Sequence, residues 1–300
     1  MTGGILTWTA IAAALGHADA VRMLTAIMLV RTAWTLTKLD TAAALRRRHG
    51  ASAEVAAKSL RRAIRIEAIG LILSILVLAA LIALLNRIGE AEIARMTLLI
   101  GIGLPVRHFG PAAGGRRRAE VFRLALTWTG LAMAAVALAA GLDWTAFALI
   151  LGVREWIALG IALIPGLRPK LDASGPPVET PLSWREVAAI TGRRARHRFT
   201  YRVGKSLLGV LGPIGNIAAR TARGIGAHRR IVPGSAWPVA TVAAGATAAA
   251  IFLPIALAKP ALLLASASLL RVAAAAGNVL LWWRFADQLP DDDEDDEEDD

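Results

Sequence analysis

Three long stretches without a charged side chain constrain this chain more than any other feature of its sequence. They cover residues 68–86, 124–142 and 231–258, and the first two are each 19 residues long. A helix crosses the roughly 30 Å hydrocarbon core of a bilayer in about 20 residues. Hydrophobic residues make up 56% of the chain, against about 45–50% in ordinary soluble domains. The sequence therefore predicts an all-α protein embedded in a membrane.

Five shorter or interrupted apolar segments add to these three, namely residues 2–15, 18–37, 93–106, 144–164 and 260–283. Together the eight segments predict a polytopic transmembrane helix bundle of about eight spans. The segments 2–15 and 93–106 are only about 21 Å long at 1.5 Å per residue, so full crossing stays open for them. The first segment also fits a secretory signal with a cleavage site at residues 18–20. A short first span is preferred, because residues 1–4 lack the basic stretch of such signals.

Basic residues gather in alternate connections between the predicted spans. Residues 38–65, 107–123 and 168–230 hold 26 of the 34 Lys and Arg residues, whereas the connections on the other side hold only Arg87, Arg95 and Lys259. Lys and Arg accumulate on the cytoplasmic side of membrane proteins. This distribution predicts a multi-pass protein of the inner membrane with both termini in the cytoplasm.

The predicted spans divide the chain into four parts. They are a six-span unit over residues 1–166, a basic cytoplasmic connection with an interfacial segment over 167–234, a two-span hairpin over 235–284, and an acidic tail over 285–300. All of the last ten residues are Asp or Glu, so the tail is expected to be disordered and solvated. The alternative is that it folds back onto the basic connection or docks a basic partner.

Both large basic connections are expected to contain helices at the membrane surface. Residues 39–66 suit a helix lying along the cytoplasmic face. In the second connection a helix is predicted to begin at Ser183, because Ser183 and Glu186 have the spacing of a capping box. A basic cluster follows it: Arg193, Arg194, Arg196, Arg198, Arg202 and Lys205. Anionic lipid headgroups are the expected partners of this cluster, at roughly 1 kcal/mol per residue, and no nucleic acid is expected.

A few charges fall inside the apolar segments. Arg31, Arg154 and Arg271 lie near the middle of three predicted spans that run in the same direction, and Arg22 lies nearer the outer end. Three guanidiniums at similar depth would form a cationic cavity suited to phosphate or diphosphate, with Glu155 balancing part of the charge. The alternative is structural: Glu155 pairs with Arg31 or Arg271, and the remaining arginines extend toward the membrane surface.

Conventional catalysis has little support in this sequence. There is no cysteine, which excludes thiolate chemistry and sulfur-ligated zinc. The five histidines, His17, His49, His108, His197 and His228, are dispersed in predicted loops without metal-ligand spacing or paired acids. We therefore predict no enzymatic activity, no catalytic residue, no metal site and no cofactor.

Four short patterns in the first 166 residues resemble the N-terminal lobe of polysaccharide flippases of the multidrug/oligosaccharidyl-lipid/polysaccharide (MOP) superfamily. They are LGHADA at residues 15–20, LDTAAALRR at 39–47, LRRAIR at 60–65 and RRRAEV at 116–121. Six spans followed by a long cytoplasmic connection also match that lobe. The second lobe is expected to be truncated, because only two predicted spans follow the connection.

The resemblance implies transport of a lipid-linked saccharide across a bacterial inner membrane, by alternating access and without nucleotide hydrolysis. It also implies that Arg31 and Arg154 contact the lipid diphosphate. A single lobe would then form a homodimer or recruit further helices. The alternative from another functional class is a non-transporting membrane scaffold for cell-envelope polysaccharide synthesis, which binds partner proteins through its basic connection and acidic tail.

Overall fold

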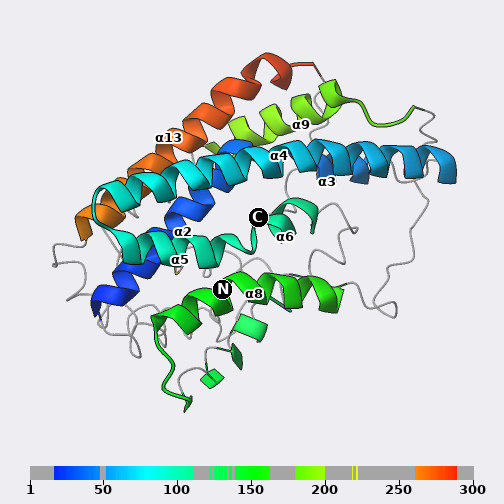
Figure 1. Ribbon diagram of the computed structural model, residues 1–300. Helices are drawn as coiled ribbons and strands as arrows, with labels where there is room; N and C mark the ends of the chain where they lie inside the picture. Colours follow the sequence, from blue (N-terminus) through cyan, green and yellow to red (C-terminus); the bar gives the residue numbers. More distant parts are fainter. Residues whose placement is uncertain are drawn as a thin grey trace, which may run out of the picture.

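The computed structural model describes residues 17–47, 52–110, 139–162, 180–199 and 261–288, with single positions between 122 and 136 and at 218 and 221. Among these residues every regular element is a helix, which confirms the predicted all-α class (Figure 1). Three described helices are long and apolar enough to cross a membrane. They are α4 (Ala53–Arg87), α8 (Trp144–Ala162) and α13 (Ala261–Ala286).

The predicted count of eight spans is not confirmed. The segment 18–37 forms α2 (His17–Thr37), which carries Arg22 and Arg31 within it and is not among the three helices that qualify as spans. The segments 2–15 and 231–258 lie outside the described residues, and so do six of the 19 positions in 124–142. What the described residues show is a helical protein with three candidate membrane spans.

The segment 93–106, predicted as one span, is two helices. The first is α5 (Ala91–Gly101) and the second is α6 (Leu104–Phe109), with Gly103 at the N-cap of α6. Pro105 has no backbone N–H, so it cannot donate to a carbonyl one turn earlier, but it fits the first turn of a new helix. The break at residues 102–103 therefore follows from Pro105, and it redirects the residues of α6.

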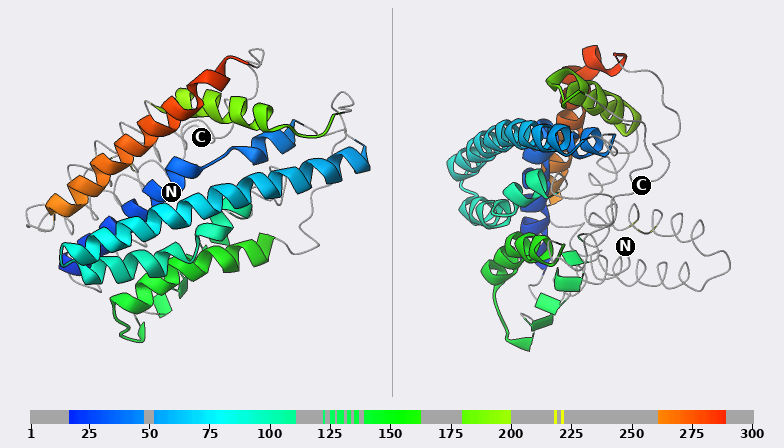
Figure 2. Two further views of the ribbon diagram at one scale, coloured as in Figure 1. Left: turned by 45° about the horizontal axis from the view of Figure 1, so that its top comes forward. Right: turned by 90° about the vertical axis from the view of Figure 1, so that its right-hand side faces the viewer.

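Helix α2 lies at the centre of the described bundle. Apolar residues occur all round it, and Val21, Met23, Ala26 and Val30 are fully buried. It contacts α4, α5 and α13, and Figure 2 shows it between α13 and α8. A helix that is apolar on every side belongs in an interior. Figure 1 also shows α2, α5, α8 and α13 beginning on the same side, where α4 ends, so the helices that carry Arg31, Arg154 and Arg271 run parallel, as predicted.

Helix α4 is arranged in the opposite way to a helix of a water-soluble protein. Its buried positions include small and polar residues: Ser59, Ala63, Glu67, Gly70 and Ser74. Its exposed positions include large apolar ones: Ile69, Ile72, Leu73, Ile75, Leu76 and Leu84. Bilayer chains are as apolar as these side chains, whereas the interior of a membrane bundle favours small residues and polar contacts. The pattern supports a membrane location for this helix.

A second, smaller core lies at the other end of α4, where the chain is more polar. Leu39, Ala63, Ile66, Leu182 and Ile190 are buried there. They come from α3 (Thr41–Arg46), the first half of α4, and α9 (Trp184–His197) with its preceding residues. Helix α9 also packs along α13 (Figure 1).

The structure confirms one predicted helix start and corrects one predicted helix. The Ser183 hydroxyl accepts a hydrogen bond from the backbone N–H of Glu186 at 3.2 Å, as the capping spacing requires. The separate surface helix predicted over residues 39–66 is wrong. Helix α3 is short, and a new helix capped by Ser52 continues unbroken from Ala53 to Arg87, because no glycine or proline interrupts it before the span.

Candidate functional site

The break before α6 turns two neighbouring polar residues, Arg107 and His108, into the bundle. Arg107 faces α8, and the His108 side chain is fully buried between α2 and α4. A Cβ at Gly103 would lie 2.8 Å from Oε2 of Glu155, so the chain approaches α8 closely only because this residue is glycine. Two polar networks start from these residues.

In the first network Arg107 forms an ion pair with the buried carboxylate of Glu155. Its Nε lies 2.8 Å from Oε1 and 2.9 Å from Oε2, and its Nη2 lies 2.6 Å from Oε1. The predicted structural pair of Glu155 with Arg31 or Arg271 therefore needs correction, because the structure gives Glu155 to Arg107. The sequence analysis placed Arg107 in the connection after the segment 93–106, and the structure shows its side chain packed against α8.

Arg154, the residue before Glu155, carries an unsatisfied group. Its Nε is buried and has no hydrogen-bond partner in the part of the chain that the structure describes. The guanidinium lies against the backbone of Gly130, whose ideal Cβ position is 3.1 Å from Nη1. It also lies within electrostatic reach of both Arg107 and Glu155. This group of two guanidiniums and one carboxylate has an excess positive charge.

The other predicted cavity residues lie elsewhere on α2 and α13. Arg271 donates from Nη1 to the sulfur of Met28 at 3.6 Å, so it belongs to the contact between α2 and α13. Arg31 lies three residues after Met28 on α2. Arg22 pairs with Asp19 at 3.0 Å and with Glu92, at the end of the bundle where α2 and α5 begin. The contacts place Arg154 and Glu155 in one polar group, Arg271 against α2, and Arg22 at the end of the bundle.

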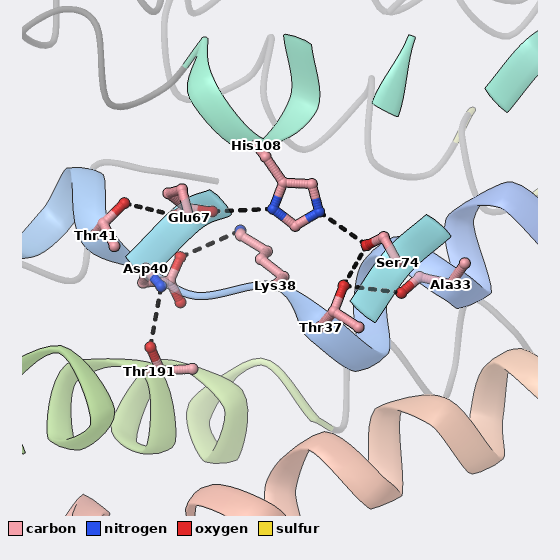
Figure 3. Close-up of polar contacts among 9 residues, drawn as sticks. All are labelled: Ala33, Thr37, Lys38, Asp40, Thr41, Glu67, Ser74, His108 and Thr191. Carbon is pink, nitrogen blue, oxygen red and sulfur yellow. Dashed lines mark hydrogen bonds and ion pairs between the residues drawn. The ribbon is translucent and has the colours of Figure 1, made fainter. Parts of the chain in front are cut away.

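The second network was missed by the sequence analysis, and Figure 3 shows it around His108. His108 Nδ1 lies 2.9 Å from Glu67 Oε2, and His108 Nε2 lies 2.8 Å from Ser74 Oγ. Thr41 donates to Glu67 Oε1 at 2.5 Å, and Ser74 contacts the hydroxyl of Thr37. One signal was available: Glu67 directly precedes the charge-free run of α4 and shares a helix face with Ser74, seven residues later.

The order Ser74, His108, Glu67 repeats the hydrogen-bond order of a serine hydrolase triad. However, the Ser74 side chain is fully buried and its hydroxyl also binds Thr37. Ser74 lies in mid-helix, where backbone amides bind carbonyls one turn earlier and are not available as oxyanion donors. The geometry suits an internal hydrogen-bond network better than attack on a substrate.

The predicted lipid-contacting cluster is described in part. Arg193, Arg194, Arg196 and Arg198 lie on or directly after α9, whereas Arg202 and Lys205 lie outside the described residues. Of the predicted tail over residues 285–300, residues 285–286 are the last of α13, and residues 289–300 lie outside the described residues. Arg196 donates from both terminal nitrogens to one oxygen of Asp287, at 3.0 and 2.8 Å. It also lies 5.3 Å from the ring centroid of Trp283. The end of α13 is thus held beside the basic residues of α9.

Among the described residues, no three His, Cys, Asp or Glu side chains form a group that would hold a metal ion. No family model, no curated protein and no solved structure matches this chain. The functional assignment therefore depends on the residues and contacts above.

Proposed function

We propose that this chain is a flippase-like membrane component that handles a lipid-linked saccharide and binds its phosphate group at Arg154. The observation that carries the proposal is the buried Nε of Arg154, which has no hydrogen-bond partner within the described residues. A buried N–H group without an acceptor costs about 1–3 kcal/mol. An anionic ligand would supply the missing acceptor.

The surroundings of Arg154 suit an anion with several oxygens. Glu155 is already occupied by Arg107 through three short contacts, so its carboxylate is not the main partner of Arg154. Phosphate and diphosphate groups accept paired hydrogen bonds from the planar guanidinium group. The proposal assigns the first phosphate contact to Arg154 and keeps Arg31 on α2 and Arg271 on α13 as candidates for a further contact.

One observation favours the scaffold alternative instead. The ion pair between Arg196 and Asp287 holds the beginning of the acidic C-terminal region beside the basic residues of α9. A partner protein that binds this region would compete with an exposed pair, and surface ion pairs are worth only about 0–1 kcal/mol. The experiment must therefore distinguish a bound lipid from a bound protein.

Native mass spectrometry of the protein, extracted gently from its own membrane, makes this distinction. The proposal predicts a bound polyprenyl-phosphate or polyprenyl-diphosphate saccharide in the wild type and its loss in Arg154→Ala. Arg95→Ala is the matched control, because Arg95 is an exposed arginine on α5. Arg154→Lys keeps the positive charge but cannot donate the paired hydrogen bonds of a guanidinium group, so it is expected to bind the lipid-linked saccharide weakly. Ordinary phospholipid alone, or a stoichiometric protein released by deleting residues 291–300, would refute transport and favour the scaffold.

A further inference from the structure

Five buried or half-buried side chains from α2, α3, α4 and α6 form an unbroken series of hydrogen bonds. It runs from Thr41 to Glu67, then to His108, Ser74 and Thr37 (Figure 3). Glu67 and His108 are 3% and 2% exposed, so water has little access to them. In such a place each hydrogen must be accounted for within the protein.

The contact at Thr37 determines which group donates and which accepts in each of these hydrogen bonds. The Thr37 hydroxyl donates to the backbone carbonyl of Ala33 at 3.1 Å, and a carbonyl can only accept. Since Thr37 has one hydrogen, it must accept from Ser74. Ser74 has then used its own hydrogen, so it must accept from Nε2 of His108, 2.8 Å away. His108 therefore carries a hydrogen on Nε2.

The contact between His108 and Glu67 then needs one more hydrogen. A neutral imidazole has a single N–H, and in this arrangement it lies on Nε2. The lone pair of Nδ1 would face Oε2 of Glu67 at 2.9 Å, and two acceptors do not bind each other. Every contact is satisfied only if a second proton lies between Glu67 and His108. The pair is then either imidazolium with carboxylate, or neutral imidazole with carboxylic acid.

Removing that second proton changes the chain in a defined way. The remaining hydrogen of His108 would move to Nδ1 to bind Glu67, and Ser74 would turn to donate to Nε2. Thr37 would then have to donate to Ser74 and give up its bond to Ala33. Two hydroxyl groups reverse and one hydrogen bond is lost. Proton occupancy thus determines how α2, α4 and α6 are joined.

We propose that Glu67 and His108 form a proton-binding site inside the bundle, which holds one exchangeable proton and reorders the Thr37–Ser74 hydrogen bonds when that proton leaves. The nearest charged groups on the loop between α2 and α3 are Lys38 and Asp40, paired at 3.2 Å beside Thr41 (Figure 3).

The remaining neighbours of the pair do not supply this proton. Arg107, next to His108 on α6, turns away to Glu155. Helix α9 contributes a hydroxyl, from Thr191 to the backbone N–H of Asp40 at 3.0 Å. On α4 itself, a Cβ at Gly70 would lie 3.3 Å from Cε1 of His108, so the glycine backbone packs directly against the imidazole and holds its orientation.

The direct test counts protons on the pair in the full chain in lipid nanodiscs. Nitrogen NMR of labelled histidine, with His108 assigned by its absence in His108→Gln, reports which ring nitrogens carry hydrogen. Infrared spectroscopy reports a protonated carboxyl that Glu67→Gln removes and the matched control Glu54→Gln leaves. We expect two protons at neutral pH: both ring nitrogens protonated, or Nε2 alone together with a protonated Glu67. A single proton on Nδ1 with ionised Glu67 overturns the proposal.

A second measurement separates a proton site from a merely rigid polar network. Above about pH 6.5 an unfolded histidine is neutral, so the folded state holds one proton more than the unfolded state. Stability then falls as pH rises, and the folded-to-unfolded ratio drops by up to tenfold per pH unit while that difference persists.

Glu67→Gln is the informative variant for this measurement. Its amide donates to Nδ1 and accepts from Thr41, so every bond is kept without an extra proton. We expect the pH dependence above neutral pH to disappear in Glu67→Gln and to remain in Glu54→Gln. An equal pH dependence in wild type and Glu67→Gln overturns the proposal. If Glu67→Gln does not fold, the proton count on the wild type still decides.

Discussion

The arrangement of Arg107, Arg154 and Glu155 predicts that the two members of one ion pair contribute unequally to stability. The wild-type group has two positive charges and one negative charge. Replacing Glu155 with alanine leaves two arginines facing each other without a carboxylate. Replacing Arg107 with alanine leaves Glu155 with Arg154, whose Nε has no partner within the described residues, so a neutral pair remains.

The magnitudes follow from this difference. Removing one member of a buried ion pair typically costs about 3–5 kcal/mol, and we expect Glu155→Ala to fall in this range. Arg107→Ala loses the fork of hydrogen bonds but gains the contact with Arg154, so we expect about 1.5–3 kcal/mol, the value of a charged hydrogen bond. The middles of these two ranges differ by about 1.8 kcal/mol, so the unfolding equilibria of the two variants should differ by more than about tenfold.

Reversible unfolding in mixed micelles of a mild detergent and dodecyl sulfate measures both variants under one condition. The double variant with Arg154→Ala added to Arg107→Ala supplies the control, because it removes the replacement partner and should be at least as unstable as Glu155→Ala. Equal costs for the two single variants, or a larger cost for Arg107→Ala, would refute the idea that Arg154 is available to Glu155.

Three further predictions concern packing and can be measured by the same unfolding assay. Leu78→Ala, at a buried position of α4, should cost about 2–5 kcal/mol, whereas Ile72→Ala, on the exposed face, should cost less than about 1 kcal/mol in a bilayer because lipid replaces the lost contact; equal losses would contradict the lipid-facing assignment. Gly152→Ala should cost about 1–3 kcal/mol, because its Cβ would lie 2.3 Å from a carbonyl oxygen of α5, and Gly160→Ala, with no atom within 4 Å, should be neutral. Ser183→Ala should cost about 1 kcal/mol through the lost cap, and an unchanged free energy of unfolding would exclude a stabilising role for that hydrogen bond.

The sequence predicted the helices better than the contacts between them. The sequence predicted the all-α class, the helix over α2, the candidate span within α4 and the cap at Ser183. These features depend on residues close together in the chain. The surface helix over residues 39–66 was wrong, since basic residues in that segment do not themselves end a helix. The segment 93–106 is not one continuous helix, because Pro105 interrupts it despite the apolar residues around it.

For the candidate sites, too, the sequence identified single residues better than the contacts between them. Arg154 and Glu155 were identified from the sequence because a charge in an apolar run is unusual. Their partner Arg107 was not, because the predicted span ended one residue before it. His108 was placed in a loop for the same reason, and Glu67 lay between the basic segment 39–66 and the charge-free run 68–86 and was assigned to neither. A boundary moved by a few residues concealed both networks.

The sequence by itself therefore determined that this chain is apolar and helical, where several helices begin and which charges are out of place. Only the tertiary structure decided which polar groups meet. Glu67 and His108 are 41 positions apart, and Arg107 and Glu155 are 48 positions apart. Their contact depends on how α4, α6 and α8 pack. Helix periodicity and capping act within a few residues, whereas the pairing of buried charges depends on the positions of whole helices.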